Sequence, residues 1–121
     1  MKLLESAEMY LETIYRLSKK NAVVRSIDVA DYMGYSKPSV SRAVSNLKKS
    51  GHLVMNADGA LLLTQEGKLA AQKIYERHSV LTEFLQGLGV PAEVASEDAC
   101  KMEHVVSDDT IEAIKRYVNK K

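Results

Sequence analysis

Three potential metal ligands stand at positions i, i+3 and i+4 near the carboxyl end of the chain: Cys100, Glu103 and His104. On a helix this spacing directs all three side chains to one face. A thiolate, a carboxylate and an imidazole on one turn form half of a divalent-metal site, and they favour a transition metal over calcium or magnesium. A thioether and a carboxylate stand three residues apart near the amino end, and one further histidine lies between these groups. The candidate ligands are Met9, Glu12, His78, Cys100, Glu103 and His104.

These residue types also have structural interpretations. A buried methionine or cysteine often fills a core, so Met9 and Cys100 are also candidates for core packing. His52 has no acidic or sulfur neighbour in sequence, which favours a surface position or a phosphate contact. A catalytic pair of Cys100 and His104 would need an oxyanion-hole loop, a phosphate-binding loop or an orienting carboxylate of the usual pattern, and the sequence has none. We therefore predict that the protein is not an enzyme.

Hydrophobic spacing predicts the elements that would hold these groups. The predicted helices are 1–20, 26–33, 36–51, 64–87, a fifth that follows the break at 89–91 and runs to about Val105, and a sixth that begins at Ser107; the predicted strands are 52–55 and 60–64. Capping residues support several boundaries: Ser26, Ser36 and Ser107 can each begin a helix, and Gly34 can end one. Pro38 falls in the first turn of the third helix, where a missing N–H has no partner to lose.

This order of elements is typical of a winged helix-turn-helix, so we predict a mainly α protein. Residues 1–64 form the expected winged helix-turn-helix DNA-binding domain. Residues 65–121 form the expected helical metal-binding and dimerisation domain, with helix 65–88 linking the two. A small helical bundle with a hairpin is the alternative fold.

The net charge of the whole chain argues against a nucleic-acid-binding protein, but the distribution of charge along the sequence does not. Seventeen basic and sixteen acidic side chains leave a net charge of +1. Residues 16–54, however, contain eight basic and two acidic side chains, a net charge of +6, whereas residues 83–109 carry −6. A basic helix-turn-helix is the expected footprint for contacts to DNA phosphates.

The start of the third helix is the region whose side chains reach base edges, and its end is better placed for phosphates. Any one of these residues could instead belong to a solvated face. The predicted DNA-binding residues are Arg25, Ser36, Lys37, Pro38, Ser39, Ser41, Arg42, Lys48 and Lys49.

The composition also suggests where the protein works and how it assembles. A single cysteine excludes an intrachain disulfide, and no apolar run approaches the length of a membrane span, so we expect a cytoplasmic protein without a membrane partner. The carboxy-terminal half has more apolar side chains than short helices could cover internally, which predicts a homodimer, although several of them could be core. These residues are Leu81, Phe84, Leu85, Leu88, Val94, Val105, Val106, Ile111 and Ile114.

Several segments together resemble the diphtheria toxin repressor family of metal-dependent transcriptional repressors. The matching segments are residues 8–15, 36–41, 63–67, 77–78 and 100–108. The resemblance implies a divalent metal held by the first helix and the carboxy-terminal helices, a homodimer, and a palindromic DNA operator. It implies no organic cofactor.

The resemblance also implies a ligand set of mixed type. Met9 and Cys100 stand where the iron-responsive branch of the family has methionine and cysteine, whereas the manganese branch has aspartate and glutamate. Glu12 follows the manganese branch, and the remaining three candidates fit both. Thr82 and Ser96 stand where the iron branch has an acidic residue and a histidine of an ancillary metal site, so that second site is not expected in the same form.

Sulfur donors favour iron(II), cobalt(II), nickel(II) or zinc(II), whereas manganese(II) prefers oxygen donors. We therefore predict a repressor that uses Fe(II) first and Mn(II) second to control metal-uptake or homeostasis genes, with Zn(II), Co(II) or Ni(II) able to bind in vitro. The alternatives are a Mn(II)-responsive member of the same family and a metal-independent winged-helix regulator that binds an organic effector.

Overall fold

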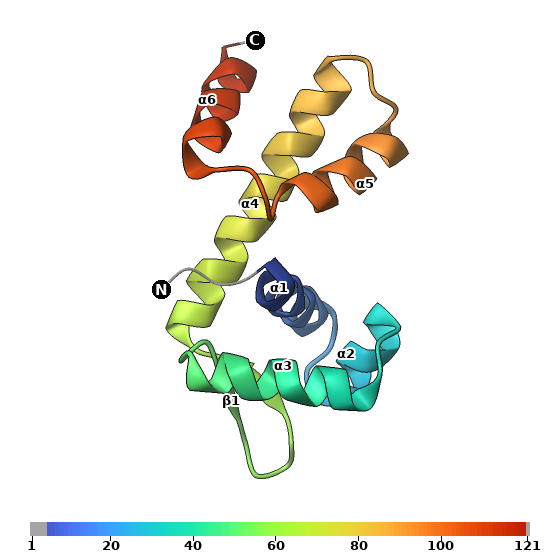
Figure 1. The fold of residues 1–121 in the computed structure, drawn as a ribbon, viewed down its shortest axis with the longest axis vertical. Helices are drawn as coiled ribbons and strands as arrows, with labels where there is room; N and C mark the ends of the chain where they lie inside the picture. Colours follow the sequence, from blue (N-terminus) through green and yellow to red (C-terminus); the bar gives the residue numbers. More distant parts are fainter. Residues whose placement is uncertain (1–4, 121) are drawn as a thin grey trace. The chain divides into compact units, whose positions relative to one another are not determined.

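The computed structural model describes residues 5–120, and within that range it contains six helices and one two-stranded sheet (Figure 1). The helices are α1 (Glu5–Lys20), α2 (Ser26–Met33), α3 (Lys37–Lys49), α4 (Gln65–Gly87), α5 (Ala92–Met102) and α6 (Asp108–Asn119), and the strands are β1 (Leu53–Met55) and β2 (Leu61–Leu63). This order confirms the mainly α, winged helix-turn-helix prediction. Residues 1–4 of the predicted first helix lie outside the described residues.

The chain divides into two compact units, one ending at Gln72 and one beginning at Lys73, so the division falls inside α4. The predicted boundary of the DNA-binding and metal-binding domains, between residues 64 and 65, stays a prediction. Each unit is described by itself below.

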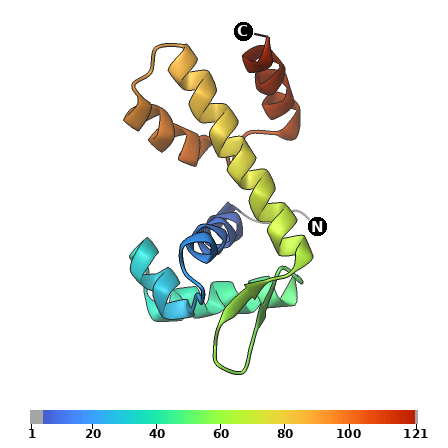
Figure 2. The ribbon, with the colours of Figure 1, turned by 180° about the vertical axis from the view of Figure 1, so that it is seen from behind.

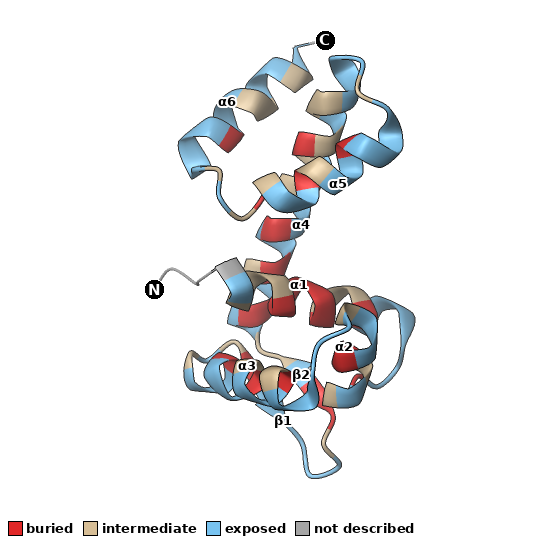
Figure 3. Cartoon of the chain, turned by 45° about the vertical axis from the view of Figure 1, so that its right-hand side comes forward, coloured by how far each residue is buried: buried red, intermediate tan, exposed pale blue. Residues whose placement is uncertain are grey.

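The amino-terminal unit has a core formed by the inner faces of α1, α2 and α3 together with the hairpin. Helix α3 buries Val40, Val44 and Leu47, which recur at the helical period, and leaves its polar residues on the other face (Figure 3). Each buried aliphatic side chain stabilises the fold by about 1.5–3 kcal/mol. This packing fixes which face of α3 remains exposed.

The boundaries of α3 follow from local chemistry. Gly34 ends α2 with φ of 72°, a left-handed conformation that favours glycine. Ser36 then caps α3, since its Oγ accepts a hydrogen bond from the Ser39 N–H at 3.3 Å, and Pro38 lies in the first turn. The predicted end of α2 at Gly34, the predicted cap at Ser36 and the place of Pro38 in the first turn are all confirmed.

The predicted N-cap of α2 was wrong by one residue. The cap is Arg25, and Ser26 is the first helical residue. The Arg25 backbone is extended and forms an isolated β-bridge with Ala60, so a tertiary contact decides where α2 begins. The Asp28 carboxylate accepts a hydrogen bond from the Arg25 N–H at 2.8 Å and completes this start.

The hairpin that follows α3 has a turn stabilised from within (Figure 2). The Asn56 side-chain oxygen accepts hydrogen bonds from the backbone N–H of Asp58 at 3.0 Å and of Ala60 at 2.9 Å. Strand β1 pairs with β2 in antiparallel register, with Leu53 opposite Leu63. The predicted hairpin is confirmed, with strands shorter than expected.

Helix α4 begins very close to the residue that precedes β1. Thr64 caps α4 by accepting the Gly67 N–H at 3.0 Å, and the Thr64 N–H donates to the His52 carbonyl at 3.1 Å. A Cβ atom on Gly67 would lie 2.0 Å from the same His52 oxygen. Glycine is therefore required here by the close approach of two backbone segments.

The carboxy-terminal unit contains the rest of α4, α5 and α6, with a small core of Leu81, Ala99 and Ile111. Met102, Val106 and Ile114 pack partly buried against these residues. Two members of the predicted dimer surface, Leu81 and Ile111, therefore belong to the core of this chain. The exposed apolar residues that remain in this unit include Leu88, Val94 and Val105.

Helix α5 ends at Met102, three residues before the predicted end at Val105. Glu103 and His104 lie in the turn that follows, although Glu103 keeps helical backbone angles as the C-cap. Ser107 then begins α6 as predicted, since its Oγ accepts the Thr110 N–H at 3.3 Å. Within the described residues, no helix combines the length and the apolar character needed to cross a membrane.

Candidate metal centre and DNA-binding surface

Two imidazole rings converge on the carboxylate of Glu103. His78 Nδ1 lies 3.0 Å from Glu103 Oε2, and His104 Nε2 lies 3.2 Å from Glu103 Oε1. The Glu103 side chain is 0% exposed and that of His104 is 2% exposed. Three of the six predicted ligands are thus brought together within the carboxy-terminal unit, and each carboxylate oxygen faces a different histidine.

The elements explain how residues 25 positions apart meet. His78 lies in the middle of α4, and Glu103 and His104 follow the last residue of α5. Because α5 packs on α4 through Ala99 and Leu81, its carboxyl end lies beside the middle of α4. Ser96 Oγ lies 3.5 Å from the second His78 nitrogen, Nε2, so both ring nitrogens of His78 face polar groups.

The donor atoms fit a divalent cation. Ligand atoms about 2.1 Å from one ion lie about 3.0 Å apart in octahedral and about 3.4 Å apart in tetrahedral geometry, and the His78–Glu103 and His104–Glu103 separations of 3.0 and 3.2 Å are within this range. A buried carboxylate is unfavourable unless a positive charge or hydrogen bonds compensate it, and a cation bound by these groups would provide that compensation. Imidazole nitrogen and carboxylate oxygen are ordinary ligands of iron(II), manganese(II) and zinc(II).

The turn that carries Glu103 and His104 is attached to α4 by Arg77. Arg77 Nη1 donates to the Glu103 carbonyl at 2.7 Å and to the Val106 carbonyl at 2.8 Å, and Nη2 donates to the Asp108 carboxylate. Lys73 Nζ also contacts Asp108, at 3.2 Å. The Arg77 hydrogen bond and then Lys73 lower the pKa of the Asp108 carboxyl below its usual value.

The remaining three predicted ligands are the two sulfur candidates and Glu12. Cys100 is on α5 and is exposed in the single chain. Met9 and Glu12 are on α1 in the amino-terminal unit, where Met9 is half-buried and Glu12 is buried. Arg16 Nη2 donates to Glu12 Oε2 at 3.3 Å, one turn along the same helix. Their roles as metal ligands stay predictions.

The exposed face of α3 carries the predicted DNA contacts. Lys37, Ser41, Arg42, Lys48 and Lys49 are exposed, opposite the buried valines and leucine. The exposed Ser45 and Asn46 lie three and four residues after Arg42 and were not among the predicted contacts. Helical spacing places both on the same side of α3 as Arg42, so they are further candidates for DNA contact.

Three predicted contacts have structural roles before any DNA is bound. The Ser36 hydroxyl caps α3 and also donates to Ser39 Oγ at 2.9 Å, so both serines hold the first turn of the helix. Arg25 Nε donates to the Asp58 carbonyl at 3.3 Å, which attaches this arginine to the turn of the hairpin. These contacts fix the positions of groups that we expect to face DNA.

Helix α1 contacts the turn before α3 through two tyrosines. The Tyr10 and Tyr35 rings have centroids 5.9 Å apart, and Tyr10 is buried. Burial raises the pKa of the Tyr10 hydroxyl, Tyr35 raises it further, and the charge of Arg42 lowers it. Tyr10 follows Met9 on α1, so this contact joins the helix that carries a predicted ligand to the turn before α3.

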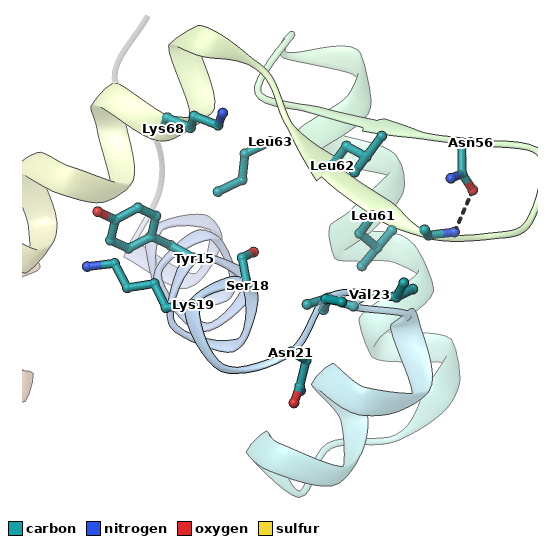
Figure 4. Close-up of a pocket in the computed structure, with 13 residues that line it drawn as sticks. Tyr15, Ser18, Lys19, Asn21, Val23, Asn56, Leu61, Leu62, Leu63 and Lys68 are labelled. Carbon is teal, nitrogen blue, oxygen red and sulfur yellow. Dashed lines mark hydrogen bonds between the residues drawn. The ribbon is translucent and has the colours of Figure 1, made fainter.

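A pocket of about 380 Å³ in the amino-terminal unit lies where α1, the α1–α2 loop, β2 and the start of α4 meet (Figure 4). Its apolar wall includes Leu61, Leu62 and Leu63, and its polar groups include Lys19 and Lys68. None of its lining residues has a carboxylate, imidazole or thiol group, so this pocket cannot hold the divalent cation.

Comparison with known proteins identifies the family. Residues 2–61 match the N-terminal DNA binding domain of iron dependent repressors, and residues 64–121 match their metal binding and dimerisation domain. The chain belongs to the iron-dependent repressor family. Members of this family are metal-dependent transcriptional repressors and not enzymes, which confirms the resemblance and agrees with the prediction that the protein is not an enzyme.

Similar proteins in the family include one named for iron and one named for manganese. Transcriptional regulator MntR of Escherichia coli O6:H1 is 35% identical over 116 residues, which are 96% of this chain and 75% of that protein. Iron-dependent repressor IdeR of Mycobacterium tuberculosis is 31% identical over 118 residues, 97% of this chain and 51% of that protein. The structure of the manganese regulator SloR aligns with a TM-score of 0.82 at 30% identity and covers 100% of this chain and 56% of that one. This member of the iron-dependent repressor family thus spans about half the length of IdeR and SloR.

Proposed function

We propose that this protein is a repressor that binds a palindromic DNA operator when loaded with a divalent metal, Fe(II) first and Mn(II) second. In this proposal it controls genes of metal uptake or homeostasis. The observation that carries the proposal is the buried Glu103 carboxylate with an imidazole nitrogen 3.0 and 3.2 Å from its two oxygens. That arrangement gives a domain of the metal-binding type a donor set that a cation can use.

The proposed ligands are three groups of the cluster and three from other positions. Glu12 is included because it is a buried carboxylate on α1 and carboxylate oxygen is an ordinary ligand of divalent transition metals. Met9 precedes Glu12 by three residues and presents a thioether on the same helical face. Cys100 precedes Glu103 by three residues and is accessible to an ion.

The choice of Fe(II) rests on Cys100 and Met9, because thiolate and thioether sulfur are poor ligands for manganese(II). A specific observation also supports the second candidate, a Mn(II)-responsive regulator. The cluster that the carboxy-terminal unit brings together has only nitrogen and oxygen donors. If Cys100 does not bind the ion, the remaining donors suit manganese(II) as well as iron(II).

The bound ion would supply positive charge that lets several acidic groups lie together. The residues of the chain then transmit the change to DNA. Glu12 and Met9 hold α1 in one position when they act as ligands, and Tyr10 on the same helix packs on Tyr35 in the turn before α3. The cap at Ser36 follows Tyr35 directly, so the position of α1 influences the orientation of the recognition helix α3.

A two-fold symmetric dimer presents two copies of α3 to DNA, and this symmetry predicts an operator with two inverted half-sites. Segment 16–54 has a net charge of +6, which supports phosphate contacts by each subunit to its own half-site. A metal that prefers the DNA-binding arrangement by about 5.5 kcal/mol would shift a two-state equilibrium from 1:99 to 99:1.

The test is metal-dependent DNA binding under anaerobic conditions. A randomised duplex library enriched with the metal-loaded protein supplies the operator, and binding to it is titrated with Fe(II), Mn(II) and Zn(II) separately. We expect Glu103→Gln to abolish the metal dependence and the exposed, matched Glu97→Gln to preserve it. Unchanged metal-dependent binding by Glu103→Gln would refute the proposed site, and a preference for manganese alone would overturn the choice of iron.

A further inference from the structure

We propose that Arg77 is a positioning residue for the metal centre: it holds the backbone turn that carries Glu103 and His104 and thereby sets the affinity for the metal. This inference rests on the proposed function, because it requires that these two residues bind the ion. Arg77 itself is not a ligand, since a guanidinium has no free lone pair and stays protonated.

The contacts of Arg77 surround the turn on both sides. Its Nη1 donates to the carbonyl of Glu103 and to the carbonyl of Val106, at 2.7 and 2.8 Å. His104 lies between these two peptide groups. Both carbonyls belong to residues after the end of α5, where the regular hydrogen bonds of the helix stop.

Backbone hydrogen bonds attach this segment to α5. The N–H groups of Val105 and Val106 both donate to the Met102 carbonyl, at 3.1 and 3.0 Å. These bonds attach the turn to α5 but do not attach it to α4, which carries His78. The Arg77 side chain ties the backbone of Glu103 to α4, one residue away from His78. It therefore sets the separation between ligands that come from different helices.

The guanidinium is itself held in place. Asp108, the first residue of α6, accepts a hydrogen bond from Arg77 Nη2 and a second from Lys73 at 3.2 Å. The Arg77 side chain is 13% exposed, so water competes little for its donors. A planar guanidinium can donate to two carbonyls and a carboxylate in fixed directions, whereas a lysine ammonium cannot reproduce this fork.

A purely structural role for Arg77 would be to join α4 to α6. A second ion pair, Glu76 with Lys115, joins the same two helices and contacts neither Glu103 nor Val106. Removing it with Glu76→Gln is thus a matched control for loss of an α4–α6 link. An effect on metal binding seen with Arg77 variants but not with this control would come from the turn.

The experiment measures cobalt(II) binding to the full chain by absorption spectroscopy, with a competing chelator to give the affinity. Residues that orient metal ligands typically change affinity by about 10–100-fold when replaced. We expect Arg77→Lys and Arg77→Gln to lower cobalt affinity by at least about tenfold and to change the cobalt absorption spectrum. Glu76→Gln should leave both unchanged. Binding is compared at a temperature at which circular dichroism shows the variants to be folded. If Arg77→Gln does not fold, the comparison of Arg77→Lys with the wild type tests the role of Arg77.

The inference and the proposed function fail in different ways. If Glu103→Gln loses cobalt binding while Arg77→Lys keeps the wild-type affinity and spectrum, the role of Arg77 is refuted and the metal site stands. An equal loss with Glu76→Gln would also refute it, because any α4–α6 link would then suffice. If the wild-type chain does not bind cobalt, or if Glu103→Gln binds it equally well, both proposals are overturned.

Discussion

Replacing Gly67 by alanine tests whether the start of α4 is fixed by a close backbone contact. An added Cβ would lie 2.0 Å from the His52 carbonyl oxygen, 3.0 Å from the His52 carbonyl carbon and 3.3 Å from Leu63 Cδ2. The first two of these atoms belong to the backbone, which cannot rotate away as a side chain can. The same oxygen accepts the Thr64 N–H at 3.1 Å, so it is already held in place.

The magnitude follows from two opposing effects. In a helix interior, alanine is more favourable than glycine by about 0.8–1.0 kcal/mol. Relief of the clash requires the two backbone segments to separate by at least about 1 Å, and such overpacking typically costs about 1–3 kcal/mol. The shift also weakens the Thr64–His52 hydrogen bond, which contributes about 0.5–1.5 kcal/mol. We therefore expect Gly67→Ala to lower the free energy of unfolding by about 1–3 kcal/mol.

The assay is urea unfolding followed by circular dichroism, with the metal-free protein at fixed salt. Gly87→Ala is the matched control, because Gly87 is the exposed last residue of α4 and is not among the glycines with positive φ. This control should be neutral or stabilised by up to about 1 kcal/mol. A Gly67→Ala protein at least as stable as the wild type would show that the close contact with His52 does not constrain this helix.

Three further predictions concern the cap of α3, the pH dependence of stability and the salt dependence of DNA binding. Ser36→Ala removes the N-cap of α3 and should destabilise the protein by about 1 kcal/mol in urea unfolding; an unchanged midpoint would argue that the cap contributes nothing. The pKa of Asp108 is lowered in the folded state, so its contribution to stability is present above its unfolded pKa, near 3.8, and is lost as the pH falls through the folded value. The stability difference between wild type and Asp108→Asn should therefore shrink below about pH 4, and a difference that persists there would contradict this assignment. Lys48→Gln removes an expected phosphate contact and should reduce the slope of log affinity against log salt by about 1, measured with the selected operator; an unchanged slope would place Lys48 outside the DNA contact.

The parts of the fold that could be predicted from sequence are those decided by neighbouring residues. Gly34, Ser36, Pro38 and Ser107 each act through bonds or dihedral angles within about three residues, and all four have the predicted roles. The start of α2 could not be predicted in this way. Its cap is set by the bridge of Arg25 to Ala60, a contact across 35 positions.

The end of α5 was wrong for a related reason. Continuation to Val105 is what local propensity favours, but the Glu103 and Val106 carbonyls are bound by Arg77 from another helix. For Leu81 and Ile111 both a dimer surface and the core were open, because a sequence does not show which apolar faces meet within one chain; both are core. Contacts with residues far away in the sequence decide both the end of α5 and the burial of Leu81 and Ile111.

The candidate site was partly accessible from sequence. The i, i+3, i+4 pattern identified Glu103 and His104, and the structure brings both together with His78. Arg77 was not predicted to contact the turn, because nothing in the sequence links it to carbonyls 26 and 29 positions away. Backbone acceptors leave no mark on residue type, so contacts of this kind emerge only from coordinates.

The division between the two compact units within α4 has a consequence for fragmentation of the protein. Domains are commonly joined by an exposed, flexible linker, which is where proteases cut. Here Gln72 and Lys73 are consecutive residues of one 23-residue helix, and cleavage between them would leave four unbonded carbonyls and four unbonded N–H groups at new helix ends. Limited digestion should therefore trim the ends or degrade the whole chain rather than release two stable halves.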